Sequence, residues 1–140
     1  MNPSDYHLFY YQYFKFIIKY FQEMGEMLEQ FNEYRQKMNE RLMSAENNKI
    51  MQRIFSVDTL TYKDGALDAR TKEMLGLVAS MVLRCDDCIK YHLVKCYELH
   101  VTSQEMMEIF GIANLVGGTI VIPHTRRAME FWDDLSAMKQ

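Results

Sequence analysis

Residues 66–83 read ALDARTKEMLGLVASMVL, and residues 84–92 continue with RCDDCIKYH. The first stretch is apolar on most sides, and small residues such as Gly76 allow another element to approach closely, so it predicts a buried helix. The second stretch reads as a break followed by a new helix, because acidic residues in a first turn suit the positive end of a helix. The two stretches together predict a helical hairpin centred near residue 84.

Two cysteines and a histidine share one face of the second predicted helix. Cys85, Cys88 and His92 are separated by three and four residues, and residues at these spacings are neighbours on a helix. Cys85 and Cys88 are then close enough to form a disulfide after a small adjustment. His92 is one turn beyond Cys88 and could share its proton. The simplest interpretation is a thiol–disulfide switch beside a base, since C-x-x-C is the usual intracellular redox spacing.

A carboxylate is predicted beside this histidine. A hairpin centred near residue 84 sets Glu73 opposite about residue 95, within one turn of His92. A proton could then pass along a chain from Glu73 through His92 to Cys88. The alternative is that Glu73 lies at the solvent-exposed edge of its helix beside Lys72.

Metal binding is a competing interpretation of the same segment. Cys85, Cys88, His92 and Cys96 form a C-x2-C-x3-H-x3-C pattern, but no glycine or proline between them would turn the chain back on an ion. On a continuous helix, Cys85 and Cys96 would be about 16 Å apart, whereas zinc–ligand bonds are about 2.0–2.3 Å. A zinc site would therefore require a non-helical segment or ligands from another chain, and we predict neither a metal nor a cofactor beyond the Cys85–Cys88 pair.

The composition is typical of one globular core with an appendage. The chain has 140 residues, 49% of them hydrophobic, and a net charge of −3, which argues against nucleic acid as the main partner. Charged residues interrupt the N-terminal segment, and no apolar run approaches the length of a membrane span, so neither a signal peptide nor a membrane partner is predicted. Three cysteines do not suggest a secreted disulfide framework, and we expect a cytoplasmic protein.

The secondary structure is predicted to be almost entirely helical. Only two prolines occur, and no strong hairpin signal is present. Asp68 can cap one helix, and Thr102 with Glu105 has the spacing of a capping box. The predicted helices span about 4–24, 26–46, 48–56, 68–83, 86–99, 103–116 and 119–137.

The N-terminal third, residues 1–46, is predicted to be a helical arm separate from a domain at 47–140. Its apolar residues alternate spacings of four and three, as in a heptad seam, so either one long helix runs through Gly25 or two helices form a hairpin there. We expect this seam to pack onto its own domain or onto another subunit. Its members are Tyr6, Tyr10, Tyr13, Ile17, Tyr20, Met24, Met27, Phe31, Tyr34 and Met38.

From Gly65 to about Leu135, roughly half the chain, the sequence resembles the carboxymuconolactone decarboxylase superfamily, especially its alkylhydroperoxidase D-like branch. The resemblance rests on LDARTKEML at 67–75, CDDCIKYH at 85–92, TSQE at 102–105 and the glycines at 117–118. It implies an all-α fold whose subunits associate intimately as trimers or hexamers.

The resemblance also implies roles for individual residues. Cys88 would attack a peroxide, Cys85 would resolve the product, and His92 and Glu73 would relay protons. The substrates would be a hydroperoxide or a disulfide together with a dithiol electron donor. Asp87 stands where the branch has a further histidine, and two acids between the thiols disfavour the thiolate.

Two further departures from the family, Cys96 and His100, are interpreted as structural: Cys96 as a small core residue and His100 as a helix-end group. Two classes of function follow. The first is a thiol-dependent oxidoreductase, a peroxidase or disulfide reductase. The second is a non-redox family member, either a decarboxylase-like lyase or a helical assembly module. Lactone decarboxylation needs no dithiol and would leave the cysteine pair idle.

Overall fold

The computed structural model describes residues 3–44 and 48–137, with side chains described from residue 11 onward except at 20, 21, 23–25 and 27. The predicted all-α class is confirmed, because the described residues contain six α-helices, one 3-10 helix and no strand. The chain divides into two compact units between residues 51 and 52. The helices are α1 (Pro3–Ser44), α2 (Lys49–Thr61), α3 (Ala69–Val82), α4 (Asp86–Glu98), α5 (Ser103–Gly117), η1 (Thr119–Val121) and α6 (Ile122–Ala137).

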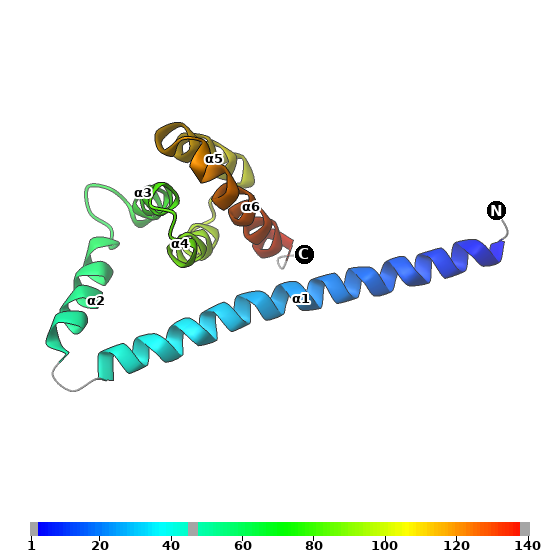
Figure 1. The fold of residues 1–140 in the computed structure, drawn as a ribbon, viewed down its shortest axis with the longest axis horizontal. Coiled ribbons are helices and arrows are strands. Elements are labelled where there is room, and N and C mark those ends of the chain that lie inside the picture. The colour runs from blue at the N-terminus through cyan, green and yellow to red at the C-terminus, as the bar shows by residue number, and fades with distance from the viewer. Residues whose placement is uncertain (1–2, 45–47, 138–140) are drawn as a thin grey trace. The chain divides into compact units, whose positions relative to one another are not determined.

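The core of the second unit is a bundle of α3, α4, α5 and α6 (Figure 1). Helix α3 packs against both α4 and α5, and α6 packs against α4. α3 and α4 form the predicted hairpin, with a turn of three residues between them. Helix α2 contributes no fully buried residue. The largest fully buried side chains are Leu77, Met81, Leu93, Met106, Val121 and Cys96.

Two helix starts form as the sequence predicts. The Asp68 carboxylate accepts a hydrogen bond from the Thr71 amide at 2.7 Å and caps α3. Thr102 and Glu105 make a complete capping box on α5, with each side chain bonded to the other residue's backbone amide. These local signals are confirmed because the residues involved are only three positions apart, so each cap depends on its own turn alone.

The ends of α3 and α4 both use a residue in the left-handed region. Arg84 has φ 60°, and the amide of Cys85 donates to the Ser80 carbonyl at 3.0 Å. His100 has φ 58° and ends α4 in the same way. A left-handed residue followed by this six-to-one hydrogen bond is a common way to end a helix, and glycine most often occupies the left-handed position. The prediction that His100 is a helix-end group is therefore confirmed.

The predicted boundaries are wrong in three places. Within the described residues, the segments predicted as separate helices over 4–24 and 26–46 form one helix, α1. Helix α2 extends to Thr61 instead of ending near 56, and within it the Thr59 and Thr61 hydroxyls bond to carbonyls four residues earlier. The segment predicted as one helix over 119–137 begins with a 3-10 turn that follows Gly118, where φ is 76°.

The first unit consists mainly of α1, which runs without interruption through Gly25. A single interior glycine costs about 1 kcal/mol relative to alanine, which a long helix can absorb, so the one-helix alternative holds. Among the seam residues whose side chains are described, Tyr13 and Tyr34 are 57% and 64% exposed. Tyr6, Tyr10, Tyr20, Met24 and Met27 have side chains outside the described set. None of the described helices is both long and apolar enough to span a bilayer.

Candidate functional site

Cys85 and Cys88 are joined by a disulfide at the start of α4. Their Cα atoms are 5.2 Å apart. Cys85 is the N-cap residue, and its sulfur accepts a hydrogen bond from the Cys88 amide at 3.4 Å. Cys88 is exposed and Cys85 is half-buried. The first turn of a helix favours a thiolate because of its unpaired amides and positive dipole end, and the Cys88 amide directs this stabilisation to the Cys85 sulfur.

Glu73 and His92 form a buried pair one turn along α4 from Cys88. The His92 Nδ1 lies 2.6 Å from the Glu73 Oε2, and the two side chains are only 9% and 5% exposed. Such a hydrogen bond fixes which ring nitrogen carries the proton and leaves Nε2 for other contacts. The structure therefore places Glu73 in the buried position beside His92 instead of at the solvent-exposed edge of α3.

Tyr62, one residue beyond α2, reaches the same pair from a separate element. Its ring centroid is 5.4 Å from that of His92. A Cβ built on Gly76 would lie 2.6 Å from the Tyr62 hydroxyl oxygen and 2.9 Å from the His92 Nε2. Gly76 thus leaves open a space that the hydroxyl and the imidazole edge both border. Burial raises the pKa of Tyr62, and the negative charge of Glu73 raises it further, so the hydroxyl keeps its proton.

Cys96, the third cysteine, lies apart from this chemistry. It is fully buried in the core of the bundle. Burial raises the pKa of its thiol to about 12, with a further contribution from the charge of Glu73. A thiol that stays protonated is a poor nucleophile, so the interpretation of Cys96 as a core residue agrees with the structure.

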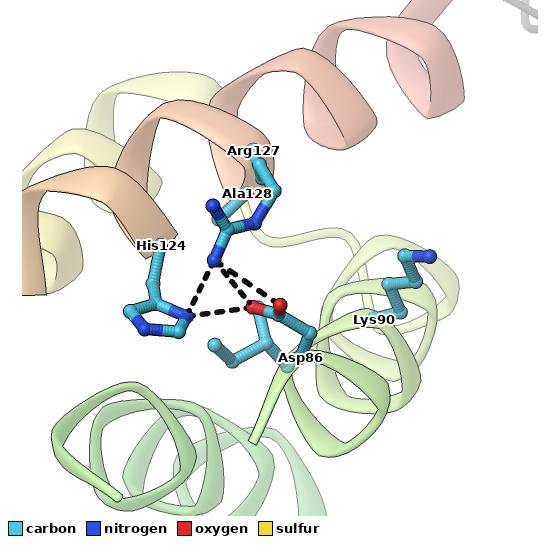
Figure 2. Close-up of a pocket in the computed structure, with 6 residues that line it drawn as sticks. Asp86, Lys90, His124, Arg127 and Ala128 are labelled. Atoms are coloured by element: carbon cyan, nitrogen blue, oxygen red, sulfur yellow. Dashed lines mark hydrogen bonds and ion pairs between the residues drawn. The ribbon is translucent and has the colours of Figure 1, made fainter. Parts of the chain in front are cut away.

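A second histidine–carboxylate pair lies on the other side of the cysteine motif, between α4 and α6. The His124 Nδ1 donates to the Asp86 Oδ1 at 2.7 Å, and the Arg127 guanidinium lies 3.1 Å from the Asp86 Oδ2 (Figure 2). Arg127 also lies 2.9 Å from the same His124 nitrogen, which cannot both donate and accept, and the shorter contact to the carboxylate is the one we assign. A shallow pocket is lined here by Asp86, Ile89, Lys90, His124, Arg127 and Ala128.

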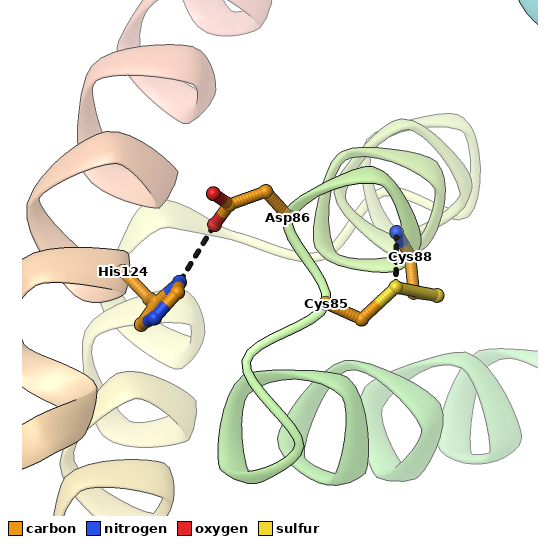
Figure 3. The surroundings of a disulfide bond; sticks show 4 residues. All are labelled: Cys85, Asp86, Cys88 and His124. Atoms are coloured by element: carbon orange, nitrogen blue, oxygen red, sulfur yellow. Dashed lines mark hydrogen bonds and ion pairs between the residues drawn. A yellow bond between two sulfur atoms is a disulfide. The ribbon is translucent and has the colours of Figure 1, made fainter.

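This outer pair changes the electrostatics of the motif. Figure 3 shows the Asp86 side chain directed toward His124, whereas the two sulfurs extend away from it. Burial alone would raise the pKa of Asp86, but the hydrogen bonds from His124 and Arg127 outweigh burial and hold that pKa below its ordinary value. The Arg127 guanidinium, together with the His124 hydrogen bond, therefore offsets one of the two acidic charges that the sequence places between the thiols.

Of the residues predicted for the site, the structure joins Cys85 to Cys88 and Glu73 to His92, and His92 follows Cys88 by four residues on α4. Sequence reasoning missed Tyr62 and the His124–Arg127 pair. Tyr62 lies outside the hairpin, and His124 and Arg127 are 38 and 41 residues from Asp86, beyond the reach of any helical spacing rule. The small residue Gly76 was the available signal, since it marked a close approach without showing what approaches.

The geometry also bears on the metal interpretation. A continuous helix from Asp86 to Glu98 carries Cys88, His92 and Cys96, and Cys85 is its N-cap, so these four residues cannot share one ion. Within residues 3–44 and 48–137, no group of three or more histidine, cysteine, aspartate or glutamate side chains is placed to hold a metal ion.

The profile of the Carboxymuconolactone decarboxylase family matches residues 48–131. The chain belongs to this family. The match covers α2 to α6 almost completely, and with it the cysteine pair, Glu73, His92 and Tyr62. A curated relative of this family member, an uncharacterised protein from Cupriavidus necator, is 27% identical over 75 residues, which span 54% of the chain and 66% of that relative.

Solved structures of relatives agree with the family assignment. One is a Thermotoga maritima protein described as a "carboxymuconolactone decarboxylase family protein possibly involved in antioxidative response"; it is 47% identical, with a TM-score of 0.74, over 79% of this chain and 92% of its own. Another, from Legionella pneumophila, is a carboxymuconolactone decarboxylase family protein that is 26% identical, with a TM-score of 0.60, over 83% of this chain and 96% of its own.

Proposed function

We propose that this family member is a thiol-dependent oxidoreductase that reduces hydroperoxides through Cys88 and Cys85. The observation that carries the proposal is the arrangement of an exposed Cys88 in the first turn of α4, bonded to Cys85, one turn from the buried Glu73–His92 pair. Disulfide exchange needs the cysteine pair, proton transfer needs the Glu73–His92 pair, and access of the substrate needs an exposed Cys88. The similarity to a protein linked by its description to an antioxidative response supports the same chemistry.

The oxidative half-reaction begins with the dithiol form. His92 takes the proton of the Cys88 thiol, and the Cys88 thiolate attacks the terminal oxygen of a hydroperoxide. The O–O bond breaks, Cys88 becomes a sulfenic acid, and the proton held on His92 goes to the leaving alkoxide to give an alcohol. The Cys85 thiol then attacks the sulfenic sulfur, so that the disulfide forms and one water is released.

The reductive half-reaction restores the dithiol. A dithiol donor attacks the disulfide, passes through a mixed disulfide and leaves as its own disulfide, while Cys85 and Cys88 recover two protons and two electrons. Cys88 is the more exposed of the two residues, so we assign its sulfur as the point of attack. No other cofactor is required by this cycle.

Steady-state turnover of an organic hydroperoxide with a dithiol donor tests the proposal. Cys88→Ser and Cys85→Ser should each abolish turnover, because one removes the nucleophile and the other the resolving thiol. Cys96→Ala is the matched control, since it removes the third, buried thiol. It should leave turnover within about threefold of wild type, because the loss of a buried side chain lowers stability and not reactivity. A Cys88→Ser variant that keeps wild-type turnover would favour a non-redox lyase or assembly module instead.

We also propose the partners and the compartment of the protein. A hydroperoxide or disulfide substrate and a dithiol donor follow from the cycle above, and a reducing, cytoplasmic setting would supply the donor. We also propose a homo-oligomer, a trimer or hexamer, because several apolar side chains stay largely exposed, among them Leu83 at 76% and Leu115 at 86%. Sedimentation of the full chain measures the subunit number.

A further inference from the structure

Helix α1 carries an apolar face that the proposed cycle does not use. Figure 1 shows one continuous helix, and its 42 residues extend about 63 Å at 1.5 Å per residue. It lies outside residues 48–131, which the family profile matches. Within the described residues, its compact unit adds only residues 49–51 of α2, so the unit has no second layer for this face. Phe14 and Phe16 are each 65% exposed and Tyr34 is 64% exposed, and a helix buries such a face against another element.

The side of α1 opposite the seam is polar along its length. A second row of residues follows the helix with the same alternating spacings of three and four, and every member is polar or charged and exposed. With one apolar seam and one polar row, α1 has the pattern of a coiled-coil helix and not that of a helix buried on all sides. The members of the polar row are Gln12, Lys15, Lys19, Gln22, Glu26, Glu29, Glu33, Gln36 and Glu40.

The seam matches itself when two copies of the helix run in opposite directions. In an antiparallel pair whose midpoint lies between residues 25 and 26, Tyr13 of one copy faces Met38 of the other, and Ile17 faces Tyr34. Every seam position from 13 to 38 then faces another seam position, so the row of contacts stays apolar. In a parallel pair each seam residue would face its own counterpart, which would place two tyrosine rings in one layer at residues 13 and 34.

The charges along α1 favour the same direction. Residues 6–22 contain Lys15 and Lys19 and no aspartate or glutamate, whereas residues 23–33 contain four glutamates and no lysine or arginine. Parallel copies would align the glutamates of one helix with those of the other. In the antiparallel register, Glu33 lies level with residue 18, between the two lysines. Exposed charges contribute little to affinity, but they discriminate between the two directions.

The residues that flank the seam are also complementary in the antiparallel register. Phe14 and Arg35 each follow a seam residue, and Phe16 and Lys37 each precede one. In an antiparallel coiled coil, equivalent flanks of the two helices lie side by side, so each phenylalanine lies within one turn of a cation of the second copy. A cation over an aromatic face is attractive, and the long stems of lysine and arginine cover apolar surface.

We propose that α1 is an assembly arm, and that the arms of two copies of this chain pair as an antiparallel coiled coil with its midpoint between residues 25 and 26. The pair is two-fold symmetric, so each arm buries the same face against the other. If the domains form trimers, three arm pairs would join two trimers into a hexamer. The inference goes beyond the proposed chemistry and requires neither the cysteine pair nor its turnover.

Crosslinking of the full chain tests the direction and the register together. In a Cys85→Ser, Cys88→Ser background, Cys96 stays buried, and Tyr13→Cys and Met38→Cys are introduced singly and together. On one helix these two positions are about 37 Å apart, so a short bis-maleimide can join them only between copies. The double variant should give covalent dimers that peptide mapping links through residues 13 and 38, and neither single variant should crosslink. Crosslinked single variants would show parallel arms, and the absence of any crosslink would show that the arms do not pair; either result overturns the proposal.

A substitution in the seam and its neighbour in the polar row give a second test. Tyr13→Glu should weaken self-association at least about tenfold and lower the subunit number in sedimentation, because a charge would be buried at two symmetric layers. Gln12→Glu is the matched control, since it adds the same charge to the exposed row and should keep the wild-type subunit number. A Tyr13→Glu protein that sediments like Gln12→Glu would overturn the proposal. Hydroperoxide turnover is not measured in either experiment, so a failure of the proposed cycle leaves both tests unchanged.

Discussion

Two histidine–carboxylate pairs flank the same cysteine motif, and they differ in burial far more than in distance. His92 and Glu73 are 2.6 Å apart, and His124 and Asp86 are 2.7 Å apart. The inner pair is almost completely buried, whereas the Asp86 side chain of the outer pair is 46% exposed and is shared with Arg127. An ion pair that water screens has a small interaction energy, whereas the same pair in a buried site interacts much more strongly. We therefore assign proton transfer to the inner pair alone.

The largest expected difference between the two pairs is in the turnover of variants that lack one histidine or the other. His92→Ala should lower hydroperoxide turnover by at least about a hundredfold, the usual contribution of a general acid–base group. His124→Ala should change turnover by less than about threefold, because an exposed pair contributes little. Turnover kinetics of the two purified variants provide the comparison. Equal losses would show that burial does not distinguish the pairs.

Glycine replacements test the space beside the inner pair, next to Tyr62 and His92. Gly76→Ala should reduce turnover roughly tenfold to a hundredfold, because its Cβ would lie 2.6 Å from the Tyr62 hydroxyl and a misplacement of about 1 Å is costly. Gly111→Ala is the control, since a Cβ at that position on α5 meets no atom within 4 Å. It should add up to about 1 kcal/mol of stability by helix propensity and leave turnover unchanged. Thermal unfolding and turnover are measured together, and a fully active Gly76→Ala would contradict the tight arrangement.

Isosteric amides remove the two carboxylate charges without changing shape. Glu73→Gln should lower turnover about tenfold, which is less than His92→Ala because the imidazole remains in place. Asp86→Asn should raise the reactivity of Cys88 by less than about threefold, since it removes an acid near the thiol and leaves His124 and Arg127. Alkylation rates and turnover of both variants measure the difference. A larger effect from Asp86→Asn would reverse the assignment of the two pairs.

The outer pair should instead be visible in the pH dependence of stability. The pKa of Asp86 is lowered in the folded protein, so its contribution is present above the unfolded pKa, near about 3.9, and is lost as the pH falls through the folded value. Because the group is exposed, Asp86→Asn should cost at most about 1 kcal/mol at neutral pH. Urea unfolding at a series of pH values should show the two proteins converging only below about pH 4. A difference that persists unchanged in acid would mean that the charge of Asp86 is not the cause.

Much of the fold followed from short-range sequence signals. Asp68 and the Thr102–Glu105 capping box depend on residues three apart, and the antiparallel hairpin followed from the break near residue 84. The end of α2 was missed because serine, threonine and aspartate usually compete with the helix, whereas here two threonine hydroxyls bond back to it. The choice between one arm helix and two at Gly25 could not be made from a single glycine, because its cost is small compared with the rest of a 42-residue helix.

The part of the candidate site that lies within the α3–α4 hairpin was predictable from the sequence. Glu73 and His92 are 19 residues apart, yet two antiparallel helices with a short turn place them opposite each other. Tyr62, His124 and Arg127 come from elements whose placement depends on packing of the whole bundle. No spacing rule connects Tyr62 to His92 or Asp86 to α6, so these contacts could be found only in three dimensions.

A single-turnover reaction tests the central claim most directly. The fully reduced protein is mixed with one equivalent of an organic hydroperoxide per chain, and free thiols, the alcohol product and the cysteine linkage are measured together. The account predicts the loss of two thiols per chain, one equivalent of alcohol and a disulfide that peptide mapping places between Cys85 and Cys88, with Cys96 still free. Retention of all three thiols, or a disulfide that includes Cys96, would contradict it.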